Sequence, residues 1–308
     1  MLGLLEDTQK MVKAKTVQQL VYAYLKSDAF RKLGRASKID YSDCLNIIED
    51  ELGHISIKSG LTVPTMQKHY NIWLERGVHR ANKIAAIMSI LINWSTKNNL
   101  RVFNPMKYLD KTPNPARKVI WEPSQVKIFL DTAYSQWKWR SVGLIVQMAY
   151  EWGQRVGDMR MLLWNAIDLN KGRCDFEQSK RGEAVHLPIS DGLMHVLRQQ
   201  HETFSFQVLV APQIQPSDGA YKPYTKEGLH VHVNAILKEA GLPKHLTAMD
   251  MRRTAITEMV EAGVDVTQIK QVSGHTSINS LTPYIKHTYT GASEALAQRS
   301  AYKDNTDG

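Results

Sequence analysis

The sequence predicts a mainly α-helical protein with a small antiparallel β-sheet, an α+β fold divided into two domains. Apolar residues recur at helical spacing through most of both halves of the 308-residue chain, as in helices with one buried face. Within the second half, three short segments between 166 and 188 instead alternate apolar and polar residues, as strands do. A proline-dense stretch separates the two halves.

The first half is predicted to form a compact helical domain. Its first helix, at 17–26, follows Thr16, whose hydroxyl can cap a helix N-terminus. The apolar stripe of this helix is Val17, Leu20, Val21 and Leu25. The same pattern predicts further helices at 41–52, from about 64 to the stop signal Arg76-Gly77, and at 81–97, with a loop at 53–63.

The boundary between the domains is predicted within a linker at about 104–119. This segment contains Pro105, Pro113 and Pro115 together with four basic residues. Prolines at this density break helices and favour an extended chain. We therefore expect one domain at 1–112 and a second at 120–308.

The second half is predicted to be mostly helical with the small sheet inserted. Strands are expected at 166–169, 173–178 and 184–188, with turn signals at 170–172 and 180–182. Helices are expected on both sides of them, at 124–133, 141–152, 191–201, 226–240, 250–262, 266–272 and after residue 277.

Positive charge is concentrated in the first part of the chain. Residues 1–119 hold 19 Lys and Arg against 10 Asp and Glu, whereas residues 120–308 hold 20 of each, so the net charge of +9 lies in the first part. Such an excess is typical of a region that binds a polyanion such as nucleic acid. A solvated surface that maintains solubility is the alternative that charge alone leaves open.

Targeting and cysteine signals predict a cytoplasmic protein with no membrane partner. No stretch approaches the roughly 18 apolar residues of a membrane span, and residues 1–15 lack the apolar core of a secretory signal. Cys44 and Cys174 lie far apart and outside any metal-binding spacing, which predicts buried or free thiols in a reducing compartment.

Two patterns in the second half carry a cation that could reach a ligand. Arg155, after Gly153-Gln154, ends a long apolar helix, and an arginine at such a junction could project into a cleft. Lys180 lies at the turn between two predicted strands, from which its side chain could reach a partner's backbone. Taken singly, each is more simply an ordinary surface cation.

Two more patterns follow towards the C-terminus. Arg252 and Arg253 open an amphipathic helix on different sides, so that one can face inward and the other solvent or phosphate. His275 follows Ser273-Gly274, where the glycine permits a tight turn, and Tyr284 comes nine positions later. Solvated arginines and a packing tyrosine are the alternatives for these residues considered alone.

Cofactor signals are absent from the sequence. It contains no glycine-rich phosphate loop of the Walker type, no Gly-x-Ser-x-Gly and no cluster with metal-binding spacing. His230 and His232 are two positions apart on a predicted helix and therefore point to different faces. An enzyme with this sequence is predicted to use no metal, nucleotide or other cofactor.

Together, the four patterns occur in an order and at intervals that resemble the tyrosine recombinase family, the phage integrases and their relatives. The resemblance covers roughly residues 16–290, with 16–104 similar to the family's helical core-site DNA-binding domain and residues from about 120 similar to its catalytic domain. It implies five catalytic residues: the two arginines Arg155 and Arg252, the hairpin lysine Lys180, the histidine His275 and the nucleophile Tyr284.

Two positions depart from the family's pattern. Ser273 stands where a leucine usually precedes the Gly-His pair, and Met249 stands where a histidine usually begins His-x-x-Arg. A thioether has no proton to transfer and no useful donor. We expect Met249 to affect rate more than reaction type; His245 could substitute, although a surface role is the simpler interpretation.

The resemblance implies a site-specific recombinase (integrase) that cleaves and rejoins DNA through a 3′-phosphotyrosyl intermediate and integrates or excises a phage or mobile element. Its implied partners are double-stranded recombination sites, a homotetramer assembled on that DNA, and accessory DNA-bending or excision factors. Basic side chains near the fourth helix, Arg76, Arg80 and Lys83, are candidates for phosphate contacts, with plain solvation as the alternative.

Three other functions remain open from the sequence. A dimer-resolving recombinase shares the fold and the chemistry. A DNA-binding relative that has lost catalysis through Met249 shares the fold only. A monomeric type IB topoisomerase shares the chemistry without requiring a specific site.

Overall fold

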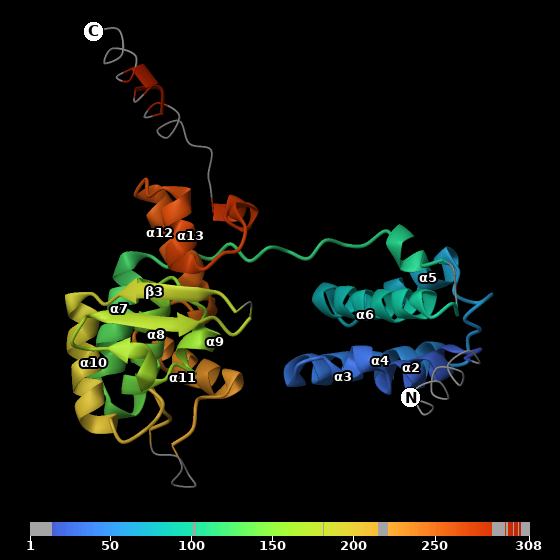
Figure 1. Ribbon diagram of the computed structural model, residues 1–308, viewed down its shortest axis with the longest axis horizontal. Helices are drawn as coiled ribbons and strands as arrows, with labels where there is room; N and C mark the ends of the chain where they lie inside the picture. The colour runs from blue at the N-terminus through green and yellow to red at the C-terminus, as the bar shows by residue number, and fades with distance from the viewer. Residues whose placement is uncertain are drawn as a thin grey trace, which may run out of the picture. The chain divides into compact units, whose positions relative to one another are not determined.

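The computed structural model describes residues 14–100, 103–180, 182–214 and 221–284, together with 293, 295–297, 299, 300 and 302. The chain divides into two compact units, Met1–Arg117 (unit 1) and Lys118–Gly308 (unit 2). Unit 1 is helical, and unit 2 combines helices with a small antiparallel sheet (Figure 1). The predicted mainly α fold with a small sheet is therefore confirmed. Among the described residues, no helix is both long and apolar enough to cross a bilayer.

The described part of unit 1 contains the helices α2 Val17–Leu25, α3 Asp28–Arg31, α4 Arg35–Leu52, α5 Val63–Leu74, α6 Val78–Lys97 and the 3-10 turn η1 Pro105–Tyr108. The three predicted helices that correspond to α2, α5 and α6 are confirmed. Thr16 caps α2, since its side chain accepts a hydrogen bond from the Gln19 amide at 3.4 Å. Thr62 caps α5 in the same way through the Thr65 amide.

The helix predicted at 41–52 is longer in the structure, and the short helix α3 before it is missed by the prediction. The buried side chains of α4 are Cys44, Leu45, Ile48 and Leu52, so its apolar period begins only in its second half. None of the four residues of α3 is buried. Sequence periodicity detects a helix through its buried apolar face, and neither α3 nor the first half of α4 has one.

The core of unit 1 is formed by α2, α4, α5 and α6 around large apolar side chains such as Tyr70, Trp73 and Met88. A polar cluster ties α5 to α4: the Trp73 indole N–H donates to the Glu51 carboxylate at 2.7 Å. Arg76 donates to the same carboxylate at 3.0 Å. Glu51 thus satisfies the polar edge of a buried tryptophan and also fixes the end of α5.

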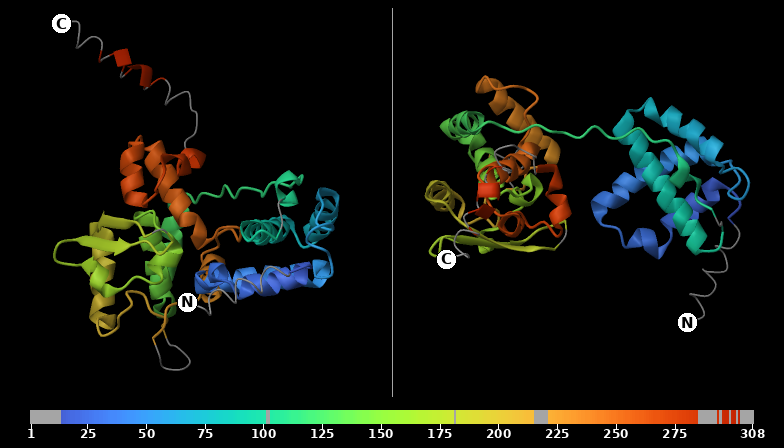
Figure 2. Two further views of the ribbon diagram at one scale, coloured as in Figure 1. Left: turned by 45° about the vertical axis from the view of Figure 1, so that its right-hand side comes forward. Right: turned by 90° about the horizontal axis from the view of Figure 1, so that it is seen from above.

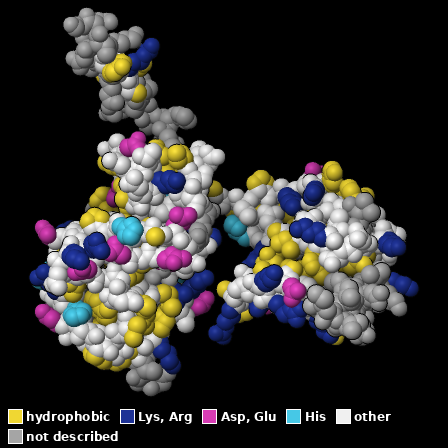
Figure 3. Space-filling model, viewed as in Figure 1, with side chains coloured by type: hydrophobic (Ala, Val, Ile, Leu, Met, Phe, Trp, Pro, Cys, Tyr) yellow, Lys and Arg dark blue, Asp and Glu magenta, His cyan; other side chains and the backbone are white. Residues whose placement is uncertain are grey.

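Basic side chains are prominent on unit 1. On the face drawn in Figure 3, Lys and Arg predominate on unit 1, whereas Asp and Glu gather on unit 2. Of the three candidate phosphate contacts, Arg76 pairs with Glu51 and Lys83 pairs with Asp40 at 2.7 Å. Their side chains remain 49% and 40% exposed, so either could exchange its carboxylate for a phosphate.

The first part of the predicted linker is anchored to unit 1 by side chains of α5 and α6. Asn82 donates through its amide to the Thr112 carbonyl at 2.8 Å and to Asn114 Oδ1 at 2.9 Å. The Tyr70 hydroxyl accepts from the Thr112 amide at 2.9 Å and donates to Asn82 at 2.8 Å. Proline density predicts an extended chain at 104–118, and these bonds hold part of that chain in place.

Asn82→Ala is expected to release this anchored segment. Removing both donated hydrogen bonds should cost about 1–3 kcal/mol locally, so amide exchange at 110–114 should accelerate roughly tenfold or more. Hydrogen-exchange mass spectrometry on the full chain measures this directly. The exposed Asn234, which contacts His230 in unit 2, gives the matched control Asn234→Ala. Exchange at 110–114 that is unchanged in Asn82→Ala would contradict the assignment.

Unit 2 is organised around one buried helix. Its described helices are α7 Pro123–Ser135, α8 Arg140–Glu151, α9 Val156–Met159, α10 Asp191–Phe204, α11 Lys226–Glu239, α12 Met251–Glu261 and α13 Val266–Ser273. Every residue of α8 from Ser141 to Ala149 is buried, because α7, α10, α11 and α12 pack around it. The helices predicted here before residue 277 are confirmed, with small shifts at their ends.

The predicted sheet is present, with strands β1 Ile167–Asp168, β2 Arg173–Glu177 and β3 Ala184–Pro188 in the order β1-β2-β3. Both pairs are antiparallel, with Cys174 opposite Ile167 in β1 and opposite Leu187 in β3. Cys174, Val185 and Leu187 are buried in the main core, so one face of the sheet packs on helices and the other is open (Figure 2). Cys44 and Cys174 are both buried free thiols, as predicted.

A small second core lies between α12, α13 and the turn that contains Leu281. Ile256 of α12, Ile269 of α13 and Leu281 are buried against one another, and Tyr284 packs on their edge. The helical pattern predicted after residue 277 appears here as two short 3-10 turns, η5 Ile278–Ser280 and η6 Thr282–Tyr284. α13 lies beside β3 (Figure 1), so this core stands next to the sheet's edge strand.

Candidate active site

Arg155 is held at the junction of α8 and α9. Gly153 ends α8 with φ +58°, a left-handed conformation that favours glycine, and the chain turns so that Arg155 directly precedes α9. Its Nη1 donates to Gln178 Oε1 at 2.8 Å and lies 3.7 Å from Asp158 Oδ2. The Arg155 side chain is 26% exposed, which leaves part of the guanidinium open to a ligand.

Lys180 stands on the turn that joins β2 to β3. The turn is closed by two backbone hydrogen bonds: the Gln178 amide donates to the Glu183 carbonyl at 2.8 Å, and the Gly182 amide donates to the Gln178 carbonyl at 2.9 Å. Ser179 donates to the buried Asp158 through its hydroxyl and, at 3.2 Å, through its amide. Asp158 therefore fixes the β2–β3 turn to α9, while Lys180 itself is exposed.

Arg252 and His275 are in direct contact. Arg252 lies in the first turn of α12, and its Nη2 lies 3.1 Å from His275 Nε2. Gly274 ends α13 with φ +62° and so turns the chain to deliver His275. The other ring nitrogen, His275 Nδ1, lies 2.7 Å from the Ser273 hydroxyl oxygen.

Tyr284 completes this group from the same chain. Its ring centroid lies 6.4 Å from that of His275, and the Arg253 guanidinium lies 5.0 Å above the tyrosine ring. The ring also packs against the small core, and the Tyr284 amide donates to the Leu281 carbonyl at 2.9 Å. The structure thus brings Arg252, His275 and Tyr284 together directly.

Buried glutamines join Arg155 to this group. Gln178, which accepts from Arg155, donates to the Ser273 carbonyl at 2.9 Å and to Gln154 Oε1 at 2.6 Å. Gln154 in turn donates to the Val272 carbonyl at 2.6 Å. The α8–α9 junction and the end of α13 are therefore cross-linked by two side-chain amides beneath the exposed groups.

Gln178, Asp158 and Arg253 lie within the sequence patterns, but sequence reasoning gives none of them a catalytic role. One usable signal exists for Gln178, since it continues the inward-facing positions 174 and 176 of β2 and is therefore a polar residue on an apolar face. A buried polar side chain needs hydrogen-bond partners. Asp158 is an ordinary charged residue in the sequence, and the sequence leaves open which of Arg252 and Arg253 faces inward. Only their contacts distinguish them.

Met249 is 75% exposed on the 3-10 turn η4 Ala248–Asp250, three positions before Arg252. The turn is held by Asp250, whose carboxylate accepts from the Thr247 amide at 3.0 Å and hydroxyl at 2.9 Å. His245 is exposed on the segment before this turn. The Met249 thioether is thus presented to solvent at the start of the helix that carries Arg252.

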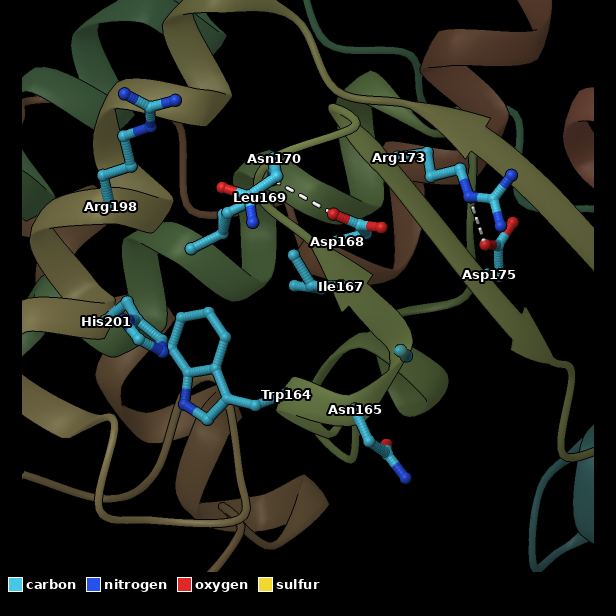
Figure 4. A pocket seen from close by; sticks show the side chains of 11 residues that line it. Trp164, Asn165, Ile167, Asp168, Leu169, Asn170, Arg173, Asp175, Arg198 and His201 are labelled. Carbon is cyan, nitrogen blue, oxygen red and sulfur yellow. Dashed lines mark hydrogen bonds and ion pairs between the residues drawn. The ribbon is translucent and has the colours of Figure 1, made fainter.

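This arrangement can bind an anion and attack it. Two guanidinium groups and an imidazole offer several N–H donors to a tetrahedral anion such as a phosphate, and a phenol stands next to them. A pocket of about 790 Å³ elsewhere on unit 2, between β1, β2 and α10, contains none of these groups (Figure 4). Its wall includes Trp164, Arg198 and His201.

Comparison with known proteins places unit 2 in a defined family. Residues 121–290 match the model of the phage integrase family. The integrase of Salmonella phage P22 is 28% identical over 184 residues, which are 56% of this chain and 46% of that protein. A tyrosine recombinase of Agathobacter rectalis is 21% identical over 160 residues, 52% of each chain. The chain thus spans about half the length of the curated relatives it matches.

Solved structures share the fold over both units. The Tn1549 transposon integrase in complex with a circular intermediate DNA aligns with 93% of this chain and 100% of its own, at a TM-score of 0.74 and 16% identity. A lambda integrase dimer bound to a COC′ core site aligns with 87% of this chain and 77% of its own chain, at a TM-score of 0.71 and 18% sequence identity. Because the family model covers more than half of the sequence, this chain belongs to the phage integrase family.

Proposed function

We propose that this chain is a tyrosine site-specific recombinase, an integrase that cleaves and rejoins DNA strands through a 3′-phosphotyrosyl bond to Tyr284. The observation that carries the proposal is the position of the Tyr284 ring, which lies beside His275 while His275 contacts Arg252. Integration or excision of a phage or mobile element is the task we infer, since the relatives that support it are integrases.

In the proposed reaction, Arg155 and Arg252 bind the two non-bridging oxygens of the scissile phosphate. Their paired N–H donors offset the negative charge that grows in the transition state, where electrostatic stabilisation counts most. His275 adds a further donor. These contacts reduce the charge repulsion that otherwise protects a phosphodiester from nucleophiles.

The covalent step exchanges one ester for another. The Tyr284 oxygen forms a bond to phosphorus and loses its proton, while the bond from phosphorus to the 5′ oxygen breaks. Lys180, at the tip of the β2–β3 turn, supplies a proton to that oxygen, so a free 5′-hydroxyl leaves. Attack by a 5′-hydroxyl of the partner strand reverses these changes and releases the tyrosine, so no ATP is consumed.

We assign the DNA-binding and catalytic roles to separate parts of the chain, the core-site-binding domain at 1–112 and the catalytic domain at 120–308. The excess of basic residues before position 119 supports the first assignment. A lambda integrase tetramer bound to a Holliday junction, with a TM-score of 0.70, supports a homotetramer on double-stranded DNA. A cytoplasmic location and accessory DNA-bending or excision factors complete the proposal.

A pool of nicked duplexes with randomised flanks tests the proposal and selects the recombination sequence in the same experiment. Cleavage next to the nick releases a short fragment, so religation fails and the enzyme stays trapped on DNA. We expect an adduct that survives denaturation, a free 5′-hydroxyl, and a nucleotide-modified peptide that contains Tyr284. An adduct at another residue, or DNA binding without any adduct, would refute the assignment. Relaxation of supercoils that lack any selected sequence would instead favour a topoisomerase.

Met249→His is expected to raise the rate of strand cleavage. A hydrogen bond from a side chain to a charged group contributes about 1.5–3 kcal/mol, so the gain should be roughly tenfold or more. Single-turnover cleavage of the selected nicked duplex measures it, with Met249→Gln as the variant that lacks a transferable proton. Equal rates for wild type and Met249→His would show that other groups already supply the hydrogen bond that a histidine at position 249 would make. A wild type without detectable cleavage, activated by Met249→His, would favour the weakened DNA-binding relative.

A further inference from the structure

We infer that Gln178 and Ser273 form a buried bridge that sets the spacing between Arg155 and the Arg252–His275 pair, which makes them positioning residues for strand cleavage. The inference rests on the proposed function and adds residues to its site. Gln178 is 1% exposed and Ser273 is fully buried. Both therefore act on the scissile phosphate through the exposed groups that they hold.

The orientation of the Gln178 amide follows from its partners. Arg155 can only donate, so the atom 2.8 Å from its Nη1 must be the amide oxygen. The Ser273 carbonyl, 2.9 Å away, can only accept, so the atom facing it must be the amide nitrogen. A single side chain thus satisfies Arg155 on one side and the backbone next to His275 on the other.

The Ser273 hydroxyl continues the bridge to His275. Its one hydrogen is donated to the Ile269 carbonyl at 2.6 Å. The 2.7 Å contact with His275 Nδ1 must then be a bond in which the ring N–H donates to the Ser273 oxygen. In the neutral ring, Nε2 then accepts a hydrogen bond from Arg252 Nη2 at 3.1 Å. His275 donates to a phosphate through Nε2 when both ring nitrogens carry protons. The leucine usual at this position in the family has no atom that could do this.

The bridge is closely packed and electrically neutral. A Cβ at Gly274 would lie 2.5 Å from Gln178 Nε2, so the amide rests directly on the turn that delivers His275. A neutral amide orients Arg155 without cancelling its charge, whereas a carboxylate at position 178 would compete with a phosphate for the guanidinium. The Asp158 carboxylate, the one the structure places within 4 Å of Arg155 among the described residues, lies 3.7 Å from its Nη1.

The test compares DNA affinity with cleavage rate in variants of the full chain, using the nicked duplex that the wild type traps. Gln178→Met and Ser273→Ala should each lower single-turnover cleavage about 10- to 100-fold, because small displacements of a catalytic group act on this scale. Affinity by fluorescence anisotropy should change by less than about threefold, since each exposed cation is retained. Gln178→Glu should be slower than Gln178→Met, and Ser273→Thr, which keeps the hydroxyl, should recover most of the rate lost in Ser273→Ala.

The double variant tests whether the two residues act as one bridge. Gln178→Met with Ser273→Ala should be less impaired than the product of the single effects, because either change already breaks the link. Gln199→Met, on the exposed surface of α10, is the control and should match wild type. Wild-type cleavage in both single variants, or multiplicative effects in the double variant, would overturn the inference. If Gln178→Met does not fold, equal rates in Ser273→Ala and Ser273→Thr overturn it. A wild type that forms no adduct contradicts the proposed function instead.

Discussion

Tyr284→Phe is expected to abolish the covalent protein–DNA adduct while DNA binding is retained. Phenylalanine keeps the ring that packs on Leu281 and lies under Arg253, so the local fold should persist. Only the oxygen that attacks phosphorus is lost. The drop in adduct formation should be at least roughly 10⁴-fold, the scale on which removal of a catalytic nucleophile acts.

The measurement is a denaturing gel of the nicked-duplex reaction beside an anisotropy titration of the same DNA. Tyr221→Phe is the matched control, because Tyr221 is partly exposed in unit 2 and contacts Phe204 and Phe206. The control should form adduct at the wild-type rate. A stable adduct in Tyr284→Phe would mean that another side chain is the nucleophile and would remove the basis of the proposed mechanism.

Arg252→Ala should lower the cleavage rate by about 10²- to 10³-fold, the usual effect of deleting one donor to a transition-state oxyanion. The change also removes the 3.1 Å contact that holds the His275 ring. Arg252→Lys should recover little of the rate, because a single ammonium cannot reproduce the planar, paired donors of a guanidinium. Single-turnover cleavage at saturating protein separates this effect from weaker binding.

The control for the arginine variants is Arg198→Ala. Arg198 lines the pocket drawn in Figure 4, which contains none of the five proposed catalytic residues. Its loss should leave cleavage within about twofold of wild type, as expected for a surface substitution away from the reaction. If Arg252→Lys cleaves as fast as wild type, Arg252 acts only as a positive charge, and the paired-donor account of phosphate binding is wrong.

Periodic burial explains why most of the fold could be predicted. Helix α10 and strand β3 each present a repeating set of buried side chains, so their residues alone reveal the element and its inward face. The early turns of α4 and the whole of α3 lack such a face and were missed. The anchored linker escaped prediction for another reason, since the amide of Asn82 reaches residues 30 and 32 positions away.

The sequence by itself determined the fold class and the order of the residues proposed for catalysis, because local periodicity and short motifs are properties of neighbouring residues. Tertiary structure alone decided that Arg252, His275 and Tyr284 meet, and that Gln178 reaches Ser273 across 95 positions of chain. Such contacts depend on how α8, α13 and the sheet pack together. The same buried amide in another packing would have other partners, so its role is a property of the folded chain.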